Sequence, residues 1–233
     1  MEKDVIIACD FASADELYGF LDKLGDEKPY LKIGMELYYA VGPEIVKKLK
    51  ARGCKLFLDL KLHDIPNTVK KAMAVLSNLN ADMVNVHTSG GIKMMEAALE
   101  GLTKPDGTHP ILIGVTQLTS TSDEMLSNEL LIGKSMEETV SHYAKNAKTA
   151  GLSGVVCSPW EAKKVKEVCG ANFLTVTPGI RFADGEKGDQ VRIATPEKAR
   201  ILGSDYIVVG RPITQAQNPK EAYLRCKHEF LGI

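Results

Sequence analysis

The sequence predicts an α/β fold, a (β/α)8 or TIM barrel, that forms a single domain over residues 1–233. Eight short β-rich segments follow one another along the chain, and patterns typical of helices lie between them. Polar residues stand at the end of nearly every β-rich segment, although the segment interiors are apolar. The length of 233 residues suits one large α/β domain better than two small ones.

The predicted strands are short, largely apolar runs. They cover residues 5–10, 30–34, 55–61, 83–87, 111–116, 154–157, 173–177 and 206–209. Side chains alternate along a strand, so the leucines of the third run lie on one face, whereas Phe57, Asp59 and Lys61 lie on the other. We expect the leucine face to pack beneath helices and the charged face to point into the space that the sheet encloses.

Helix signals occupy the segments between several strands. The predicted helices cover residues 13–24, 42–52, 66–79, 139–150 and 195–202. Ser13 is the expected N-cap of the first helix, and Glu16 completes the pattern of a capping box. Pro43 stands at the first helical position of the second helix, and Gly53 and Gly151 follow the second and fourth helices as expected C-caps.

A doubly wound open sheet is the main competing fold. Such a sheet usually carries a glycine-rich phosphate-binding turn directly after its first strand. Here the first strand runs into the sequence CDFASADE, which contains no glycine. The barrel is therefore the favoured architecture.

The overall composition is that of an ordinary globular protein, with 44% hydrophobic and 25% charged residues. The formal net charge of -1 gives no general attraction for nucleic acid or for an acidic membrane surface. The N-terminal sequence MEKDVIIACD has too short an apolar run for a signal peptide, and no later run approaches a membrane span. The five cysteines are scattered without a C-x-x-C pair, as in reduced intracellular proteins. We therefore expect a cytoplasmic protein that binds neither nucleic acid nor membrane.

Charged and polar residues gather where the predicted strands end, which is where the functional residues of a (β/α)8 barrel lie. These positions hold Asp10, Lys32, Asp59, Lys61, Asp64 and His87, then Gln117, Thr119 and Ser120, and finally the segments TPGIR and VVGRPIT. Charges are costly at such places unless they are paired or used in function. A structural ion pair is the simpler interpretation of one D-x-K-x-x-D pattern, but polar ends on so many strands favour an active site.

The loops after the seventh and eighth strands form the usual phosphate site of this fold. Gly179 and Gly210 let backbone N–H groups approach an anion, and Arg211 can bind it in a bidentate manner. The same short sequences are common as plain turns, but their place in the barrel favours phosphate binding. The polar loop 182–189, FADGEKGD, is either an ordinary solvated loop or a lid, and Gln190 at its far end is placed to reach inward.

The lysines and aspartates suit chemistry that develops negative charge on carbon. Neighbouring carboxylates favour the ammonium form of Lys61, which makes it a proton donor and a poor Schiff-base nucleophile. An aspartate held against a substrate carboxylate would repel it until CO2 leaves, and Lys61 could then stabilise and protonate the carbanion. The five histidines do not pair at metal-ligand spacings, so no metal site is expected.

A set of motifs extends over nearly the whole chain: DFAS, LKIGMEL, FLDLKLHDIPNTV, VHTSGG, GVTQLTS, VTPGIR, GDQVRIATP and VVGRPIT. Together they resemble the orotidine 5'-phosphate decarboxylase family of the bacterial type. FLDLKLHDIPNT is highly specific, whereas PGIR and VVGR are looser but occur in the right order and spacing. The resemblance implies a lyase that converts orotidine 5'-phosphate to UMP and CO2, the final step of UMP biosynthesis. It also implies a homodimer that uses no cofactor and shares its active sites across the subunit interface.

The resemblance further implies roles for individual residues. The catalytic network would be Lys32, Asp59, Lys61 and Asp64, in which Lys61 protonates C6 of the pyrimidine, Asp59 lies by the departing carboxylate and Asp64 comes from the partner subunit. The other substrate contacts would be Thr68 toward the ribose, Asp10 and Lys32 on the ribose hydroxyls, Thr119 on the pyrimidine edge, Arg181, Gly210 and Arg211 at the phosphate, and Gln190 between phosphate and pyrimidine.

Two alternative functions remain open. The first is a Mg2+-dependent sugar-phosphate decarboxylase or aldolase of the same barrel superfamily, such as a keto-gulonate-phosphate decarboxylase or a hexulose-phosphate synthase. Lys32 would repel a divalent metal, and the HDIPNT sequence favours the pyrimidine enzyme. The second is a non-catalytic barrel that binds a phosphoryl ligand. The crowded set of Asp59, Lys61 and Asp64 disfavours it, because a simple binder has no need to hold like charges together.

Overall fold

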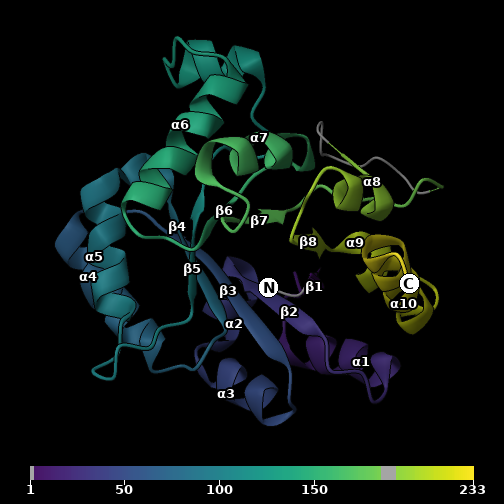
Figure 1. The fold of residues 1–233 in the computed structure, drawn as a ribbon. Helices are drawn as coiled ribbons and strands as arrows, with labels where there is room; N and C mark the ends of the chain where they lie inside the picture. Colours follow the sequence, from purple (N-terminus) through teal and green to yellow (C-terminus); the bar gives the residue numbers. More distant parts are fainter. Residues whose placement is uncertain (1–2, 185–192) are drawn as a thin grey trace.

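Eight parallel strands close into a barrel in the computed structural model, which describes residues 3–184 and 193–233. Each strand pairs with its neighbours in chain order, and β1 pairs with β8 to complete the ring. Helices surround the strands on the outside (Figure 1). The predicted (β/α)8 barrel is therefore confirmed.

The strands lie within two residues of their predicted positions. They are β1 (Asp4–Ala8), β2 (Tyr30–Gly34), β3 (Lys55–Leu62), β4 (Met83–His87), β5 (Ile111–Val115), β6 (Gly154–Val156), β7 (Leu174–Thr177) and β8 (Tyr206–Val209). The first strand ends at Ala8, two residues earlier than predicted, so Asp10 stands on the loop that follows it. This loop stays close to the sheet, because the Cys9 N–H donates to the carbonyl oxygen of Lys32 at 2.9 Å.

The helices include several that the sequence pattern does not locate. They are α1 (Ala14–Leu24), α2 (Met35–Val41), α3 (Glu44–Ala51), α4 (Pro66–Ser77), α5 (Ile92–Leu102), α6 (Met136–Thr149), α7 (Pro159–Cys169), α8 (Pro196–Ile201), α9 (Arg211–Thr214) and α10 (Pro219–Leu231). A 3-10 turn (Thr88–Gly90) follows β4, and a π-helical turn (Met125–Glu129) precedes α6. The five predicted helices correspond to α1, α3, α4, α6 and α8.

Two helix starts differ in detail from their predictions. Ser13 caps α1 by accepting the Glu16 N–H, but the Glu16 carboxylate accepts from Ala12 instead of returning to the N-cap. A full capping box forms at α6, where Ser135 and Glu138 bond reciprocally. This box starts α6 three residues before the predicted position 139, because it satisfies the free N–H groups at the helix end.

The core has two layers, as the alternation along the strands predicts. Leu56 and Leu58 belong to the large cluster between the barrel and the helices. Phe57 belongs to the smaller cluster inside the barrel, together with Ile6 and Met83. Asp59 continues the inward face of β3 beyond Phe57, so its carboxylate lies above the apolar plug that fills the barrel.

An aspartate holds the start of β4 against β3. The Asp82 backbone N–H donates to the carbonyl oxygen of Leu56 at 2.8 Å, and its side chain accepts the Leu56 N–H at 2.7 Å. The same carboxylate also pairs with Lys50 of α3 at 2.7 Å. One residue thus links a helix to two neighbouring strands.

The same arrangement recurs half a barrel away, at the start of β8. Asp205 exchanges backbone and side-chain hydrogen bonds with Thr175 of β7, at 3.1 and 2.8 Å. Its carboxylate pairs with Lys166 of α7 at 2.5 Å. We call the Asp82 and Asp205 groups the two strand-start clamps.

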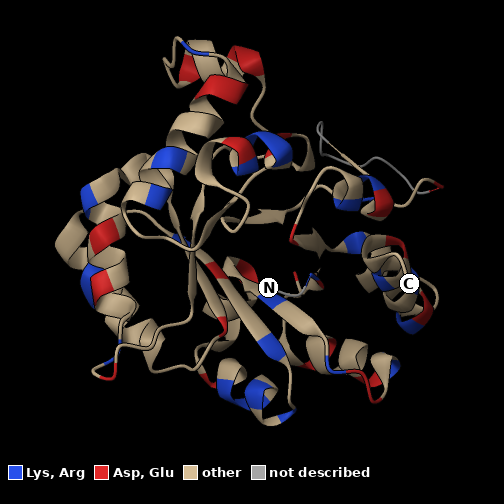
Figure 2. Ribbon diagram, viewed as in Figure 1, with Lys and Arg blue, Asp and Glu red and all other residues tan. Residues whose placement is uncertain are grey.

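The outer surface carries both signs of charge. Figure 2 shows basic and acidic residues interspersed over the helices around the barrel. All five cysteines lie in the described part of the chain, where they are buried and form no disulfide. Among the described residues, no helix combines the length and apolar character that crossing a bilayer requires.

Candidate active site

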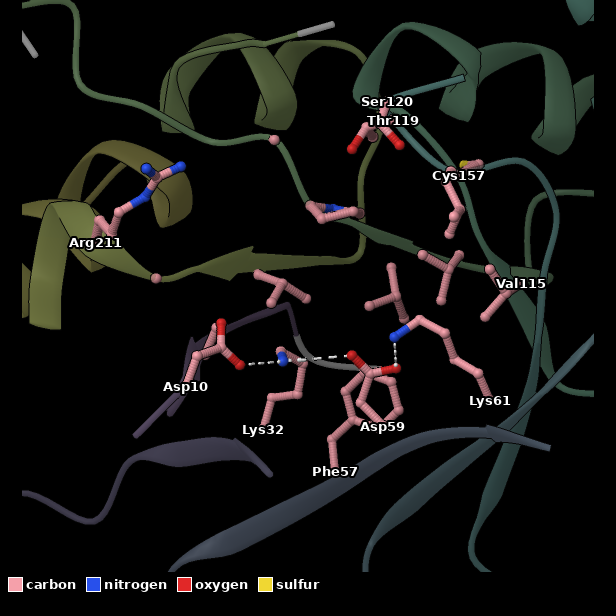
Figure 3. Close-up of a pocket in the computed structure, with 18 of the residues that line it drawn as sticks. Asp10, Lys32, Phe57, Asp59, Lys61, Val115, Thr119, Ser120, Cys157 and Arg211 are labelled. Atoms are coloured by element: carbon pink, nitrogen blue, oxygen red, sulfur yellow. Dashed lines mark hydrogen bonds and ion pairs between the residues drawn. The ribbon is translucent and has the colours of Figure 1, made fainter. Parts of the chain in front are cut away.

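A cavity of about 570 Å3 opens at the C-terminal ends of the strands. Many of the residues singled out from the sequence line it: Asp10, Lys32, Asp59, Lys61, Gln117, Thr119, Ser120, Gly179, Arg181, Gly210 and Arg211. They come from positions spread over most of the chain, and the closure of the barrel brings them together (Figure 3).

Four charged side chains of alternating sign form a row across this cavity (Figure 3). Lys32 Nζ lies 3.0 Å from Asp10 Oδ1 and 3.4 Å from Asp59 Oδ2. Lys61 Nζ donates to the other oxygen of Asp59 at 2.7 Å. We call Asp10, Lys32, Asp59 and Lys61 the charged row.

Lys32 and Asp59, at the centre of the row, are kept in their charged forms by the neighbouring charges of the row. Burial alone would raise the pKa of Asp59, but the charges of Lys32 and Lys61 and the hydrogen bonds to its carboxylate lower it below the usual value. Burial alone would lower the pKa of Lys32, but Asp59 and Asp10 raise it above the usual value. Each buried charge is therefore stabilised in its ionised form by the neighbour of opposite sign.

Gly34 leaves the space that the row needs. A Cβ atom at this position would lie 3.3 Å from both Asp10 Oδ1 and Lys32 Nζ, closer than ordinary contact. Gly34 ends β2 beside Asp59 in the strand register. A side chain at position 34 would therefore press on the ion pair between Asp10 and Lys32.

Asn85 is a member of the site that the sequence analysis missed. It is 1% exposed on β4, and its amide bonds both to the Asp59 carboxylate and to the Lys61 backbone. A signal was present, because alternation from the core residue Met83 points Asn85 into the barrel, where an amide is unusual. Cys157 and Gln215 also line the cavity without having been predicted.

The opposite side of the cavity carries the two loops predicted to bind phosphate. Arg211 lies across the cavity from Lys61, at the start of α9 and directly after Gly210 (Figure 3). Gly179 follows β7 with φ +85°, a left-handed conformation that suits glycine. The loop turns back on itself at this point, since the Ala194 N–H donates to Gly179 and the Arg181 N–H donates to Ala194, both at 3.0 Å.

Two of the predicted site residues do not line the cavity, and a third lies outside the described part of the chain. Asp64 and Thr68 are exposed and are not among the residues that line it. The Asp64 carboxylate instead accepts its neighbour's N–H, from Ile65, at 2.6 Å. Gln190 and most of the predicted lid lie outside the described residues.

The fold brings together two histidines that are distant in sequence. The rings of His63 and His87 lie 5.7 Å apart, and Lys61 and Asp59 are near enough to act on the charge of His87. Burial, His63 and Lys61 all lower the pKa of His87. Within residues 3–184 and 193–233, no group of three or more His, Cys, Asp or Glu side chains is placed to hold a metal ion.

Comparison with known proteins places this site in a family context. The model of the orotidine 5'-phosphate decarboxylase / HUMPS family matches residues 3–226. An orotidine 5'-phosphate decarboxylase of Bacillus cytotoxicus is 56% identical over 236 residues, which cover 100% of this chain and 99% of the relative. A Geobacillus protein of the same name is also 56% identical, over 100% of this chain and 98% of the relative.

Solved structures agree with the sequence relatives. The crystal structure of orotidine 5'-phosphate decarboxylase from Lactobacillus acidophilus matches with a TM-score of 0.88 and 45% identity, over 98% of this chain and 99% of the other. An uncharacterized conserved protein from Geobacillus kaustophilus matches with a TM-score of 0.86 and 51% identity, over 97% and 99% of the two chains. The chain therefore belongs to the orotidine 5'-phosphate decarboxylase / HUMPS family.

Proposed function

We propose that this protein is a cytoplasmic lyase that decarboxylates orotidine 5'-phosphate to UMP and CO2, the last step of UMP biosynthesis, with residues 1–233 as one catalytic domain. The observation that carries the proposal is the charged row, in which two ammonium groups flank the buried Asp59 carboxylate at the mouth of the barrel. Full-length identity of 56% to relatives named for this activity supports it.

Lys61 is the proposed proton donor. When the bond between C6 and the carboxylate breaks, CO2 leaves and the electron pair stays on C6 of the pyrimidine. The Lys61 ammonium, fixed against Asp59 at 2.7 Å, stabilises this negative charge and then gives its proton to C6, which completes UMP. The neutral lysine regains a proton from solvent before the next turnover.

Asp59 is proposed to act on the substrate carboxylate. Its own charge is maintained by Lys32 and Lys61, so it cannot avoid repulsion by taking up a proton at neutral pH. A substrate carboxylate placed beside it is destabilised, and this repulsion disappears as neutral CO2 forms. The same lysines stabilise the charge that develops on the ring.

The rest of the cavity fits the remaining parts of a nucleotide. The Asp10–Lys32 pair offers an acceptor and a donor to the ribose hydroxyls, and Thr119 is proposed to contact the pyrimidine edge. Arg211 lies on the far side of the cavity, where the 5'-phosphate would bind against Gly210 and near Arg181. Gln190 is proposed to join phosphate and pyrimidine.

A homodimer would complete the site. Asp64 and Thr68 are exposed on their own subunit, as expected of residues that serve a neighbouring cavity. Ile65 between them is 66% exposed, an apolar side chain that a partner subunit would cover. We propose that Asp64 extends the charged row of the partner and that Thr68 approaches the partner's ribose.

The Mg2+-dependent alternative is disfavoured by the position of one lysine. Lys32 Nζ occupies the space between Asp10 and Asp59, where two carboxylates could otherwise share a cation. We therefore propose a reaction that needs neither metal nor cofactor. A non-catalytic binder is disfavoured because the buried charged row would weaken a site that had only to hold an anion.

The first test is an ultraviolet assay of purified protein with orotidine 5'-phosphate, run with and without EDTA. Loss of the orotate absorbance at the same rate in both conditions is expected. No loss in either condition would refute the proposal, and sugar phosphates with Mg2+ would then be the substrates to examine. Activity that EDTA abolishes would refute the metal-free reaction.

Lys61→Ala is the decisive variant for the mechanism. We expect kcat to fall at least about 10²–10⁴-fold, the usual contribution of a positioned proton donor. UMP should still bind, because Arg211 and the phosphate loops lie on the far side of the cavity. Lys47→Ala is the control, since Lys47 is exposed and pairs only with Glu44 among the described contacts of its side chain. Near-normal turnover by Lys61→Ala would remove Lys61 from the chemistry.

A further inference from the structure

We propose that Asn85 is a positioning residue for the reaction, one that sets the geometry of both Asp59 and Lys61. The inference rests on the proposed function and adds a residue that the resemblance does not assign. Asn85 lies on β4 with 1% of its surface exposed, on the face that points into the barrel. It is a neutral amide among the charges of the site.

Both polar atoms of the Asn85 side chain are used. Its Nδ2 donates to Asp59 Oδ1 at 2.7 Å, and its Oδ1 accepts the Lys61 backbone N–H at 2.8 Å. Because one partner can only accept and the other can only donate, the amide has a single satisfactory orientation. The residue thus connects the carboxylate and the backbone of the proton donor through one rigid planar group.

The backbone of β3 explains why such a link is needed. Leu58 pairs with Val84 and Leu62 pairs with Val86, so four steps along β3 match only two steps along β4. Lys61 lies within this irregularity with φ +50°, a conformation that a residue with a side chain rarely adopts. In place of a regular ladder partner, its N–H is bound by Asn85.

These bonds determine where the Lys61 ammonium lies in the cavity. Asp59 Oδ1 receives both Asn85 Nδ2 and Lys61 Nζ at 2.7 Å, which leaves Oδ2 facing Lys32. An apolar residue at position 85 would leave the Asp59 oxygen and the Lys61 N–H without this partner. A carboxylate there would repel Asp59, and a cation would add a charge to the row. An asparagine supplies both bonds without either cost.

The first experiment compares Asn85→Leu with the wild type in kcat, UMP affinity, thermal stability and crystal structure. A shift of about 1 Å in reacting groups can cost about 100-fold in rate, so we expect kcat to fall by about that factor. UMP affinity should stay unchanged, whereas Arg211→Ala should lower it. Asn146→Leu is the matched control, because Asn146 is a half-buried amide on α6 whose side chain hydrogen-bonds only to His142 in the described structure. The crystal structure should show Lys61 displaced from Asp59.

The second experiment uses Asn85→Asp. This substitution keeps an oxygen that accepts the Lys61 N–H, but the side chain can donate to Asp59 only when its carboxyl is protonated. The introduced carboxyl would face Asp59, the Lys61 N–H and the Lys61 ammonium from β3, since this ammonium shares Asp59 Oδ1 with it. It would also face the uncharged Ile113 from β5 and His87 farther along β4. In its acid form it can donate to Asp59 and accept from Lys61 as the amide does. Burial and Asp59 favour that acid form, whereas the Lys61 ammonium favours the ionised form. The ratio of variant to wild-type kcat should therefore rise as the pH falls.

Several results would overturn the inference. Wild-type kcat in a folded Asn85→Leu protein would do so, and so would a crystal structure in which Lys61 keeps its backbone angle and its contact with Asp59. A parallel loss of kcat, UMP affinity and thermal stability would show a purely structural role. If Asn85→Leu does not fold, wild-type kcat in an Asn85→Asp protein whose crystal structure shows both hydrogen bonds of residue 85 lost decides against the inference. Failure of the wild type to act on orotidine 5'-phosphate would refute the proposed function instead, and the crystal structure would still test the link.

Discussion

Asp59 is the residue on which the charged row depends, since it accepts from Lys32, Lys61 and Asn85. Because the folded protein lowers the pKa of Asp59 below its ordinary value of 3.8, ionised Asp59 stabilises the fold above pH 3.8. This stabilisation is lost as the pH falls through the lowered pKa of the folded protein. The raised pKa of Lys32 contributes stability that is present below the ordinary value of 10.5 and is lost as the pH rises through the raised one. Across the range between those two ordinary values, both groups stay charged and support the fold.

His87 differs from the charged row because its surroundings disfavour its charged form. Its folded pKa lies below the ordinary value of 6.5, first because of burial and then because of His63 and Lys61. As the pH falls through 6.5 the unfolded chain takes up a proton that the folded protein resists, so the free energy of unfolding decreases. We expect this decrease between about pH 7 and pH 5 to be smaller in His87→Asn, measured by urea unfolding.

His142→Asn is the control for this measurement, because His142 lies exposed on α6 and contacts Asn146. It should leave the slope of stability against pH as in the wild type. An equal slope in His87→Asn and the wild type would show that His87 takes up its proton as readily in the folded protein as in the unfolded chain.

At the scale of elements, the strand-start clamps fix the helices to the barrel at the end opposite the cavity. Each clamp uses one carboxylate to join a helix lysine and the N–H of the preceding strand. Asp82 and Asp205 occupy equivalent places half a barrel apart, before β4 and β8. These are the strands that carry Asn85 and lead into the Arg211 loop, so the clamps anchor both sides of the site from below.

Removing one clamp should destabilise the protein without altering the cavity directly. Asp205→Ala takes the partner from Lys166 and from the Thr175 N–H, both poorly exposed. Loss of a largely buried hydrogen-bonding partner costs about 2 kcal/mol. For a chain of this length that corresponds to a fall in Tm of roughly 4–8 °C, measured by calorimetry.

The comparison for this prediction is a surface pair on the same helix. Glu167 of α7 lies 3.8 Å from Lys164, and both side chains are exposed. Glu167→Ala should therefore change the unfolding free energy by less than about 0.5 kcal/mol. Equal effects of the two substitutions would mean that the clamp adds nothing beyond an ordinary surface ion pair.

At the scale of the whole molecule, the sequence predicts the barrel and most of the cavity because both follow from local patterns. Alternation on β3 separates Leu56 and Leu58 from Phe57 and Asp59, and the observed core layers agree. The register irregularity before Leu62 could not be predicted, since it depends on how β3 meets β4. Alternation along β4 points Asn85 into the barrel, but its bonds to Asp59 and Lys61 depend on that irregularity. Helices such as α2 and α9 are too short to show a clear periodic pattern.

The exposed position of Asp64 is explained if the protein assembles as a dimer. Its motif places it with Asp59 and Lys61, yet the fold leaves it exposed and outside the cavity of its own subunit. The two observations agree if the protein is a dimer in which each Asp64 serves the other subunit. Size-exclusion chromatography with light scattering should then give twice the mass of 25.4 kDa.

Mixed subunits test this sharing directly. Asp59→Ala and Asp64→Ala proteins should each be nearly inactive, because each lacks one carboxylate in every site. In a mixed dimer one site carries both defects and the other carries neither. Random exchange makes about half of the dimers mixed, so about one quarter of the wild-type activity should return.

A mixture of Asp59→Ala with Lys61→Ala should recover nothing, because both residues belong to the same subunit's row. If exchange is verified by native mass spectrometry and the first mixture also stays inactive, Asp64 does not act across the interface.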